Sequence, residues 1–122
     1  MESNQLHYLT EQLINACAKM EAIFTEVKRT DEQRDFFHEV KPFADNVHQL
    51  LAQWNDLALP WVQQYRPKHI FPQQLITTKE HMEKLAVEVF YPTSSWKRLK
   101  STLQSCLYIL HRVKEALERQ SK

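Results

Sequence analysis

The chain has 122 residues, of which 43% are hydrophobic and 25% are charged, and its 16 basic and 15 acidic side chains leave a formal net charge of +1. This length and composition suit one globular domain over residues 1–122, and the even charge balance gives no broad field that would attract nucleic acid or an anionic membrane. The chain contains no glycine, which argues against tight β-hairpins and against the glycine-rich phosphate loops of nucleotide-binding folds.

Apolar residues spaced three and four apart predict a first amphipathic helix over residues 6–27. The basic residues Lys28 and Arg29 follow this pattern, as is common at a helix C-terminus. Thr30, with Gln33 three residues later, is typical of a capping box. We therefore expect the next helix to start at Thr30.

The same spacing runs from Phe36 to Trp61 and predicts a second helix that extends to about residue 65. Pro42 lies inside this pattern. A proline in a helix interior removes one backbone hydrogen bond and crowds the preceding turn, which costs about 3 kcal/mol. Because the apolar pattern keeps its phase across Pro42, we predict a kinked helix and not two separate helices. Pro60 is expected to bend the tail of this helix across the end of the bundle.

The predicted link to the third helix occupies residues 66–72. Pro72 suits the first turn of that helix, where its missing N–H does no harm. Thr77, followed three residues later by Glu80, offers an alternative start. The apolar pattern of this third helix is the shortest of the four and ends before Pro92.

A fourth helix is predicted over residues 96–117, and Thr93, Ser94 and Ser95 offer several N-caps for it. Four amphipathic segments joined by short links favour antiparallel neighbours packed at a shallow angle. The predicted fold is therefore all-α, a four-helix up-and-down antiparallel bundle with a proline-kinked second helix.

Few residues in the predicted core could carry chemistry. Cys17 and Cys106 both fall on apolar faces, near mid-height of the neighbouring first and fourth helices, so we predict two buried and reduced thiols close to one another. A di-iron bundle would need inward-facing Glu-x-x-His motifs, which the sequence lacks. His7, His48 and His111 lie at different heights on three helices, where they would not surround one ion. We therefore expect no metal, no cofactor and no catalytic residue.

Aromatic residues are expected to gather at both ends of the bundle. Phe37 and Tyr91 lie at one end and off the apolar faces, so they would form a partner-binding patch if they are exposed together. Phe36 and Trp96 lie at the same end but are assigned to the apolar faces. The basic residues that follow Trp96 could indicate a contact with nucleic acid, but the mixed charge of the chain favours an ordinary solvated face.

At the other end, the second helix is longer than the third, so part of its apolar face needs another cover. We expect the link after the second helix to fold back over it as a lid. If the lid is mobile, an open groove becomes the best place for a partner helix or an apolar ligand. The candidate residues of this groove are Trp54, Leu57, Trp61, Tyr65 and Phe71.

A family resemblance rests on packing and turn residues, which are Asp35-Phe36-Phe37, Val40-Lys41-Pro42-Phe43-Ala44-Asp45, Trp54, Trp61, Pro67-Lys68-His69-Ile70 and Lys97-Arg98. With these residues the chain resembles the YppE-like family of small helical proteins of Gram-positive bacteria, a domain of unknown function. The resemblance covers most of the chain and implies a bacterial cytosolic protein with a helical-bundle fold. It carries over no catalytic or binding residue.

The leading functional interpretation is a non-catalytic protein-interaction or regulatory bundle in the cytoplasm. No apolar run approaches the length of a membrane span, and the N-terminus lacks the pattern of a signal peptide. The alternative is a small helical-bundle enzyme or metal-binding protein, which would need polar groups that point into the bundle. We expect another protein as the partner, with no nucleic acid and no membrane, and the sequence leaves the oligomeric state open.

Overall fold

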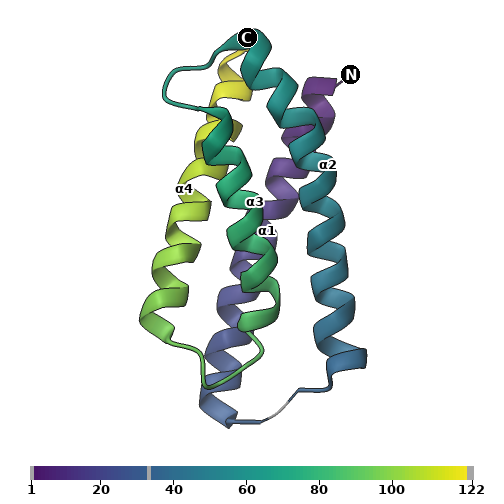
Figure 1. The fold of residues 1–122 in the computed structure, drawn as a ribbon, viewed down its shortest axis with the longest axis vertical. Helices are drawn as coiled ribbons and strands as arrows, with labels where there is room; N and C mark the ends of the chain where they lie inside the picture. The colour runs from purple at the N-terminus through teal and green to yellow at the C-terminus, as the bar shows by residue number, and fades with distance from the viewer. Residues whose placement is uncertain (1, 33, 121–122) are drawn as a thin grey trace.

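The computed structural model describes residues 2–32 and 34–120, which form four long helices and one short helical turn (Figure 1). No strand occurs in these two ranges, so the predicted all-α class is confirmed. None of the helices there combines the length and hydrophobicity that crossing a membrane requires. The helices are α1 (Glu2–Thr30), α2 (Lys41–Tyr65), α3 (Pro72–Glu88) and α4 (Trp96–Gln120), and a π-helical turn, η1 (Phe36–Val40), runs directly into α2.

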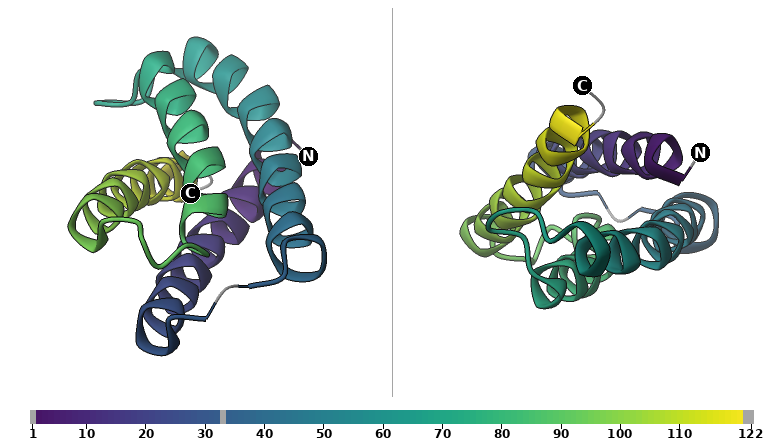
Figure 2. Two further views of the ribbon diagram at one scale, coloured as in Figure 1. Left: turned by 60° about the horizontal axis from the view of Figure 1, so that its bottom comes forward. Right: turned by 90° about the horizontal axis from the view of Figure 1, so that it is seen from above.

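The four helices run in alternating directions and form a ring in which each helix packs against its two neighbours (Figure 1 and Figure 2). α1 and α3 each contact both α2 and α4. The start of α1 and the end of α4 therefore lie at one end of the bundle, together with the link of residues 66–71. We name this the terminal end. The links with residues 31–32 and 34–35 and with residues 89–95 lie at the opposite end, which we name the loop end.

The core is built from the apolar faces of all four helices, and its polar groups are used in bonds between and within helices. Thr10 Oγ1 donates to the Leu6 carbonyl oxygen at 2.7 Å and accepts from Trp54 Nε1 at 3.0 Å. Asn55 Nδ2 donates to the Leu75 carbonyl oxygen at 3.3 Å. Such bonds remove the penalty of burying a polar group. The largest fully buried side chains include Trp54, Phe24, Leu13, Met20, Leu51, Leu75, Met82, Leu85, Leu99 and Leu110.

The N-terminus of the second helical segment differs from the sequence prediction. Thr30 is the last residue of α1, and residues 31–32 and 34–35 are not helical. The first turn after the link is capped by Asp35, whose Oδ1 accepts from the His38 backbone N–H at 3.0 Å. The prediction that Thr30 starts the next helix is therefore wrong, and its expected partner Gln33 lies outside the described residues. An aspartate five residues later makes the capping bond instead.

Pro42 is accommodated without a break in the helix. In η1, the Val40 N–H donates to the Asp35 carbonyl at 3.2 Å and the Lys41 N–H reaches the Phe36 carbonyl, so these bonds span five residues. α2 follows at once, with Pro42 in its first turn, where the absence of an N–H costs little. No non-helical residue separates η1 from α2. The predicted continuity is confirmed, whereas the kink angle stays a prediction.

The later helix starts follow the sequence prediction. Pro72 is the first residue of α3, which confirms one of the two expected starts, and the alternative start Thr77 lies inside the helix. α4 begins at Trp96, where Ser95 Oγ accepts from the Arg98 N–H at 3.3 Å. The hydroxyl cap and the proline therefore set these two boundaries.

The links turn without glycine. Arg66 ends α2 with a φ of 45°, and its N–H donates to the Val62 carbonyl at 2.9 Å. Asp31 and His69 have φ values of 53° and 65°. These are the only positive φ angles among the described residues. The left-handed region favours glycine, so the chain makes these turns with residues that carry a Cβ atom.

Candidate functional site

The groove predicted from the sequence is closed at the terminal end. Trp54 and Trp61 are buried, Leu57 is half-buried, and Tyr65 and Phe71 are exposed. The structure therefore does not bring these five side chains to one open surface. The groove stays a prediction for a state in which the link has moved.

The link covers the terminal end by burying Ile70, while Trp61 Nε1 donates to Gln120 Oε1 at 2.9 Å. A pocket of about 400 Å³ remains beside the link. Its floor is made by Ile70 and its rim includes Phe71, which is 60% exposed. The full lining is Val62, Gln63, Arg66, Pro67, Ile70, Phe71 and Pro72.

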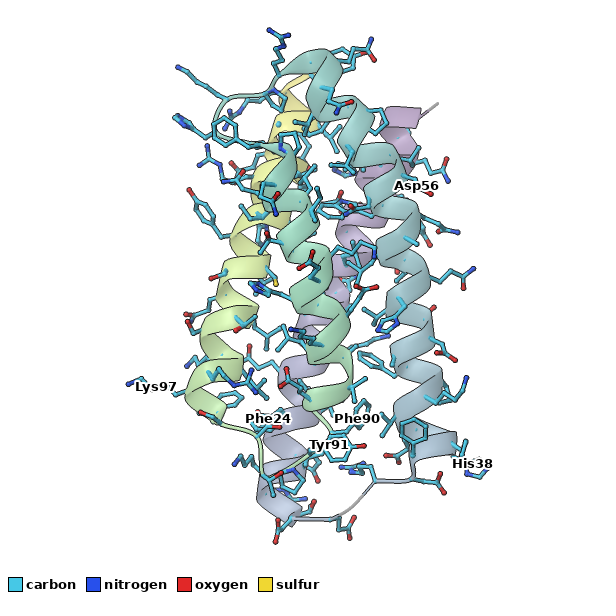
Figure 3. The ribbon with its side chains drawn as sticks, viewed as in Figure 1. Phe24, His38, Asp56, Phe90, Tyr91 and Lys97 are labelled. Atoms are coloured by element: carbon cyan, nitrogen blue, oxygen red, sulfur yellow. The ribbon has the colours of Figure 1, made fainter. Side chains whose placement is uncertain are left out.

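Aromatic side chains are exposed at the loop end. Phe37 is 72% exposed and Tyr91 is also exposed, as their positions off the apolar faces predict. Phe36, at 46%, and Trp96, at 36%, are exposed as well, so their assignment to the buried apolar faces is wrong. Phe24, at the same end of the bundle (Figure 3), is buried and stacks on Trp96.

The Phe36 and Phe37 rings pack edge to face, with their centroids 5.3 Å apart and their planes at 89°. We name the exposed part of these two rings the Phe36–Phe37 surface. The turn that carries it is fixed at both ends, because Val40 is buried and Asp35 caps the first turn. Asp35 Oδ2 also lies 3.0 Å from His38 Nδ1. The hydrogen bonds from the His38 side chain and backbone lower the pKa of the Asp35 carboxyl.

A pocket of about 430 Å³ lies next to η1 at the same end. Arg34 Nη1 contacts Glu39 Oε2 at 3.3 Å, which ties the link to the turn. Arg34 Nε is buried and has no hydrogen-bond partner among the residues that the structure describes, whereas 24% of the side chain as a whole is exposed. The pocket is lined by Ala22, Ile23, Glu26, Arg34, Glu39, Phe43 and Phe90.

His7 and His48 contact other protein groups at two separate places in the bundle. His7 Nε2 lies 2.9 Å from Glu118 Oε2 and its Nδ1 lies 3.4 Å from Glu11 Oε1, which ties α1 to α4. His48 Nε2 lies 3.1 Å from the Glu83 carbonyl oxygen, on α3. In the part of the chain that the structure covers, no three His, Cys, Asp or Glu side chains are grouped so as to hold a metal ion.

The two cysteines are buried and free, as the sequence predicts. Burial raises the pKa of both thiols to about 12, and the charge of Cys106 contributes to the shift at Cys17. That electrostatic interaction is consistent with the expected proximity of the two side chains. A thiol with such a pKa is almost wholly protonated at neutral pH and is a poor nucleophile.

Comparisons with known proteins place the chain among bacterial proteins. The family model for a bacterial domain of unknown function (DUF1798) matches residues 10–117. A Bacillus subtilis (strain 168) protein named Uncharacterized protein YppE is 31% identical over 120 residues, which cover 98% of each chain. The crystal structure of YppE from Bacillus subtilis matches with a TM-score of 0.94 at 30% identity, covering 99% of this chain and 98% of that one. A protein of unknown function from Listeria innocua matches with a TM-score of 0.94 at 28% identity, covering 98% and 96%. The resemblance to the YppE-like family is confirmed.

Proposed function

This chain belongs to the DUF1798 family of bacterial domains of unknown function, and we propose that it acts as a non-catalytic module that binds another protein. The observation that carries the proposal is the Phe36–Phe37 surface. Single exposed apolar residues are common on proteins, but two adjacent phenylalanines on one turn form a continuous apolar patch. Aromatic side chains are enriched at protein interfaces, where their burial supplies much of the binding energy.

The rigidity of η1 supports the same role. The Asp35 cap, the buried Val40 and the contact between Arg34 and Glu39 hold the turn in one conformation. Phe36 and Phe37 are therefore presented before a partner arrives. Side chains that are already ordered lose less entropy on binding, so the same buried area gives a higher affinity.

The pocket next to η1 gives the partner a polar anchor. The Arg34 side chain, which is 24% exposed, and the apolar side chains Phe43 and Phe90 line this pocket. A partner that covers the Phe36–Phe37 surface and places a backbone carbonyl oxygen against the exposed part of the Arg34 guanidinium would use both features. The pairing of an aromatic anchor with a single oriented hydrogen bond is typical of specific interfaces.

A second candidate surface lies at the terminal end. Tyr65 and Phe71 are exposed there beside the pocket of about 400 Å³. Opening the groove that contains Trp54 and Trp61 would require Ile70 to leave the core, so this surface is the less favoured one.

We place the proposed role in the cytoplasm. Cys17 and Cys106 are free thiols in the structure. Unpaired cysteines are usual in the reducing cytosol, whereas secreted domains of this size often carry disulfides. The thiols support the location together with the sequence-based expectation.

The proposal is tested by capturing partners of the full-length protein in the bacterium that encodes it. Cross-linking in cells, purification and mass spectrometry would identify proteins held by the wild type. The variant Phe37→Ser removes the most exposed ring of the Phe36–Phe37 surface, and we expect it to lose the captured partner. Circular dichroism would establish that the variant keeps its helical content.

Phe71→Ser is the matched control, because Phe71 is a phenylalanine that is 60% exposed at the opposite end of the bundle. We expect this variant to capture the same partner as the wild type. Loss of the partner in Phe71→Ser and retention in Phe37→Ser would move the interaction to the terminal end. A partner that neither variant loses would contradict both surfaces.

A further inference from the structure

A second concave surface at the loop end lies between the last turns of α1 and the start of α4. It is a pocket of about 520 Å³ lined by Thr25, Lys28 and Trp96, and we name it the Trp96 pocket. One face of the Trp96 indole stacks on the buried Phe24 ring, with centroids 5.3 Å apart and planes at 17°. The stack fixes the indole while 36% of Trp96 stays accessible to solvent.

Positive charge surrounds this indole. Lys100 Nζ lies 5.8 Å from the Trp96 ring centroid, and Lys28 Nζ lies 5.4 Å from the Phe24 ring centroid. Lys97, which directly follows Trp96, projects away from the bundle (Figure 3). Within the described ranges, neither Lys28 nor Lys100 forms an ion pair with a carboxylate, so no acidic side chain there neutralises their charges.

The arginines next to these two lysines do form ion pairs with carboxylates, so the lack of ion pairs is local to the pocket. Arg29 forms an ion pair with Glu26, and Arg98 with Glu88, at the edges of the same region. The first turn of α4 contains no acidic residue, although acidic residues are the ones favoured at that end of a helix. Lys28 lies in the last turn of α1, where the helix dipole favours a cation, so only the start of α4 keeps cations where acidic residues would be favoured.

We propose that the Trp96 pocket binds an acidic peptide segment of a partner protein. An apolar side chain of the segment packs against the exposed part of the Trp96 indole, beside Lys100, and carboxylates on either side of it pair with Lys28 and Lys100. The inference rests on the proposed role in binding proteins, but it assigns a different surface from the Phe36–Phe37 surface. The argument for this occupant is charge complementarity around an aromatic floor.

The size of the charged region favours a peptide over a nucleic acid. A nucleic acid strand needs a row of cations that follows its phosphates over several nucleotides. Here the unpaired cations lie within two short segments of helix, and the carboxylates of Glu26 and Glu88 border them. A peptide needs only a few carboxylates around one apolar side chain, which this region can accommodate.

The fluorescence of Trp96 can report on the positive electrostatic potential around it. The chain has three tryptophans, and Trp54 and Trp61 are buried, so quenching by ions in solution reports mainly on Trp96. We expect iodide to quench the full-length protein at least about twofold more strongly than caesium, relative to the ratio for a free tryptophan amide, because an anion concentrates near the lysines. The double variant Lys28→Glu/Lys100→Glu should reverse that preference. An unchanged preference in the variant would overturn the electrostatic part of the inference.

Binding is tested with a short synthetic peptide that has glutamates and aspartates around a central phenylalanine. Titration by calorimetry should show binding that weakens as salt is added and falls by about tenfold or more in Lys28→Glu/Lys100→Glu and in Trp96→Leu. Lys84→Glu, which reverses an exposed lysine on α3, is the matched control and should bind like the wild type. Melting curves of each variant would establish that it is folded.

Two further probes decide between occupants. The same peptide with glutamine and asparagine in place of its acids should not bind, and equal binding of that neutral peptide would overturn the proposal. Single-stranded oligothymidylate that binds more tightly than the acidic peptide would also overturn it in favour of a nucleic acid. A partner that is captured in cells through Phe37, together with no binding of the acidic peptide, would refute this inference and leave the proposed function intact.

Discussion

The substitution Thr10→Val tests the hydrogen bond that joins α1 to α2 in the core. The Thr10 hydroxyl is fully buried, donates to the Leu6 carbonyl and accepts from Trp54 Nε1 at 3.0 Å. Valine has nearly the same shape, so the change removes the hydroxyl and leaves the indole N–H buried without an acceptor. A stranded donor of this kind costs about 1–3 kcal/mol. For a domain of this size the melting temperature should fall by about 4–12 °C.

The assay is urea unfolding followed by circular dichroism, which gives the change in the free energy of unfolding. Thr102→Val is the matched control, since Thr102 Oγ1 donates to the Arg98 carbonyl at 3.0 Å but accepts from no buried donor within the described residues. Its cost should stay below about 0.5 kcal/mol. In a Trp54→Phe background no donor is stranded, so Thr10→Val should lose most of its cost. Equal costs for the two threonines, or an unchanged cost in that background, would refute the reasoning.

Three further outcomes are expected. Cys17 and Cys106, with pKa values of about 12, should react with Ellman's reagent at pH 8 at least about a hundredfold more slowly in the native protein than in denaturant. Asp35→Ala should destabilise the protein at neutral pH. Hydrogen bonding lowers the folded-state pKa of this carboxyl, so the stability that Asp35 contributes is fully present above the usual pKa of aspartate and is lost as the pH falls through the lowered value. Melting temperatures of the wild type and the variant, measured as a function of pH, should therefore converge in acid. Gln120→Ala removes the acceptor of Trp61 Nε1 and should cost about 0.5–1.5 kcal/mol while acrylamide quenching of the tryptophans increases.

The helices could be predicted from the sequence because their apolar residues keep a regular spacing and their ends carry strong local signals. Pro72 and Ser95 mark the starts of α3 and α4 through chemistry that acts within one turn. Thr30 carried a similar local signal and was misassigned, because α1 continues through it and Asp35 caps the following turn. Two competing capping residues within one short link cannot be ranked by spacing alone.

The exposed aromatic residues of the loop end were harder to predict. Phe36 continues the spacing of α2, but η1 is a wider π-turn at the edge of the bundle, so that side chain is nearly half exposed. Trp96 also fits the apolar face of α4, yet 36% of it is exposed although Phe24 stacks on its ring. Whether the last side chain on an apolar face is covered depends on how the links fold, and the periodicity of a helix does not contain that information. Phe37 was predictable as exposed because it lies off the apolar face.

The turns made at Asp31, Arg66 and His69 have a consequence for the unfolded chain. A left-handed conformation costs a residue with a Cβ atom about 1–2 kcal/mol, and glycine at these positions would relieve that strain. Glycine at these positions would also make the denatured ensemble more flexible, because the chain contains no glycine. The folded protein therefore tolerates three strained turns. Its denatured ensemble is stiffer than that of a chain with glycine at these positions, so it loses less conformational entropy on folding. Part of the stability of this bundle therefore comes from the low conformational entropy of its denatured state.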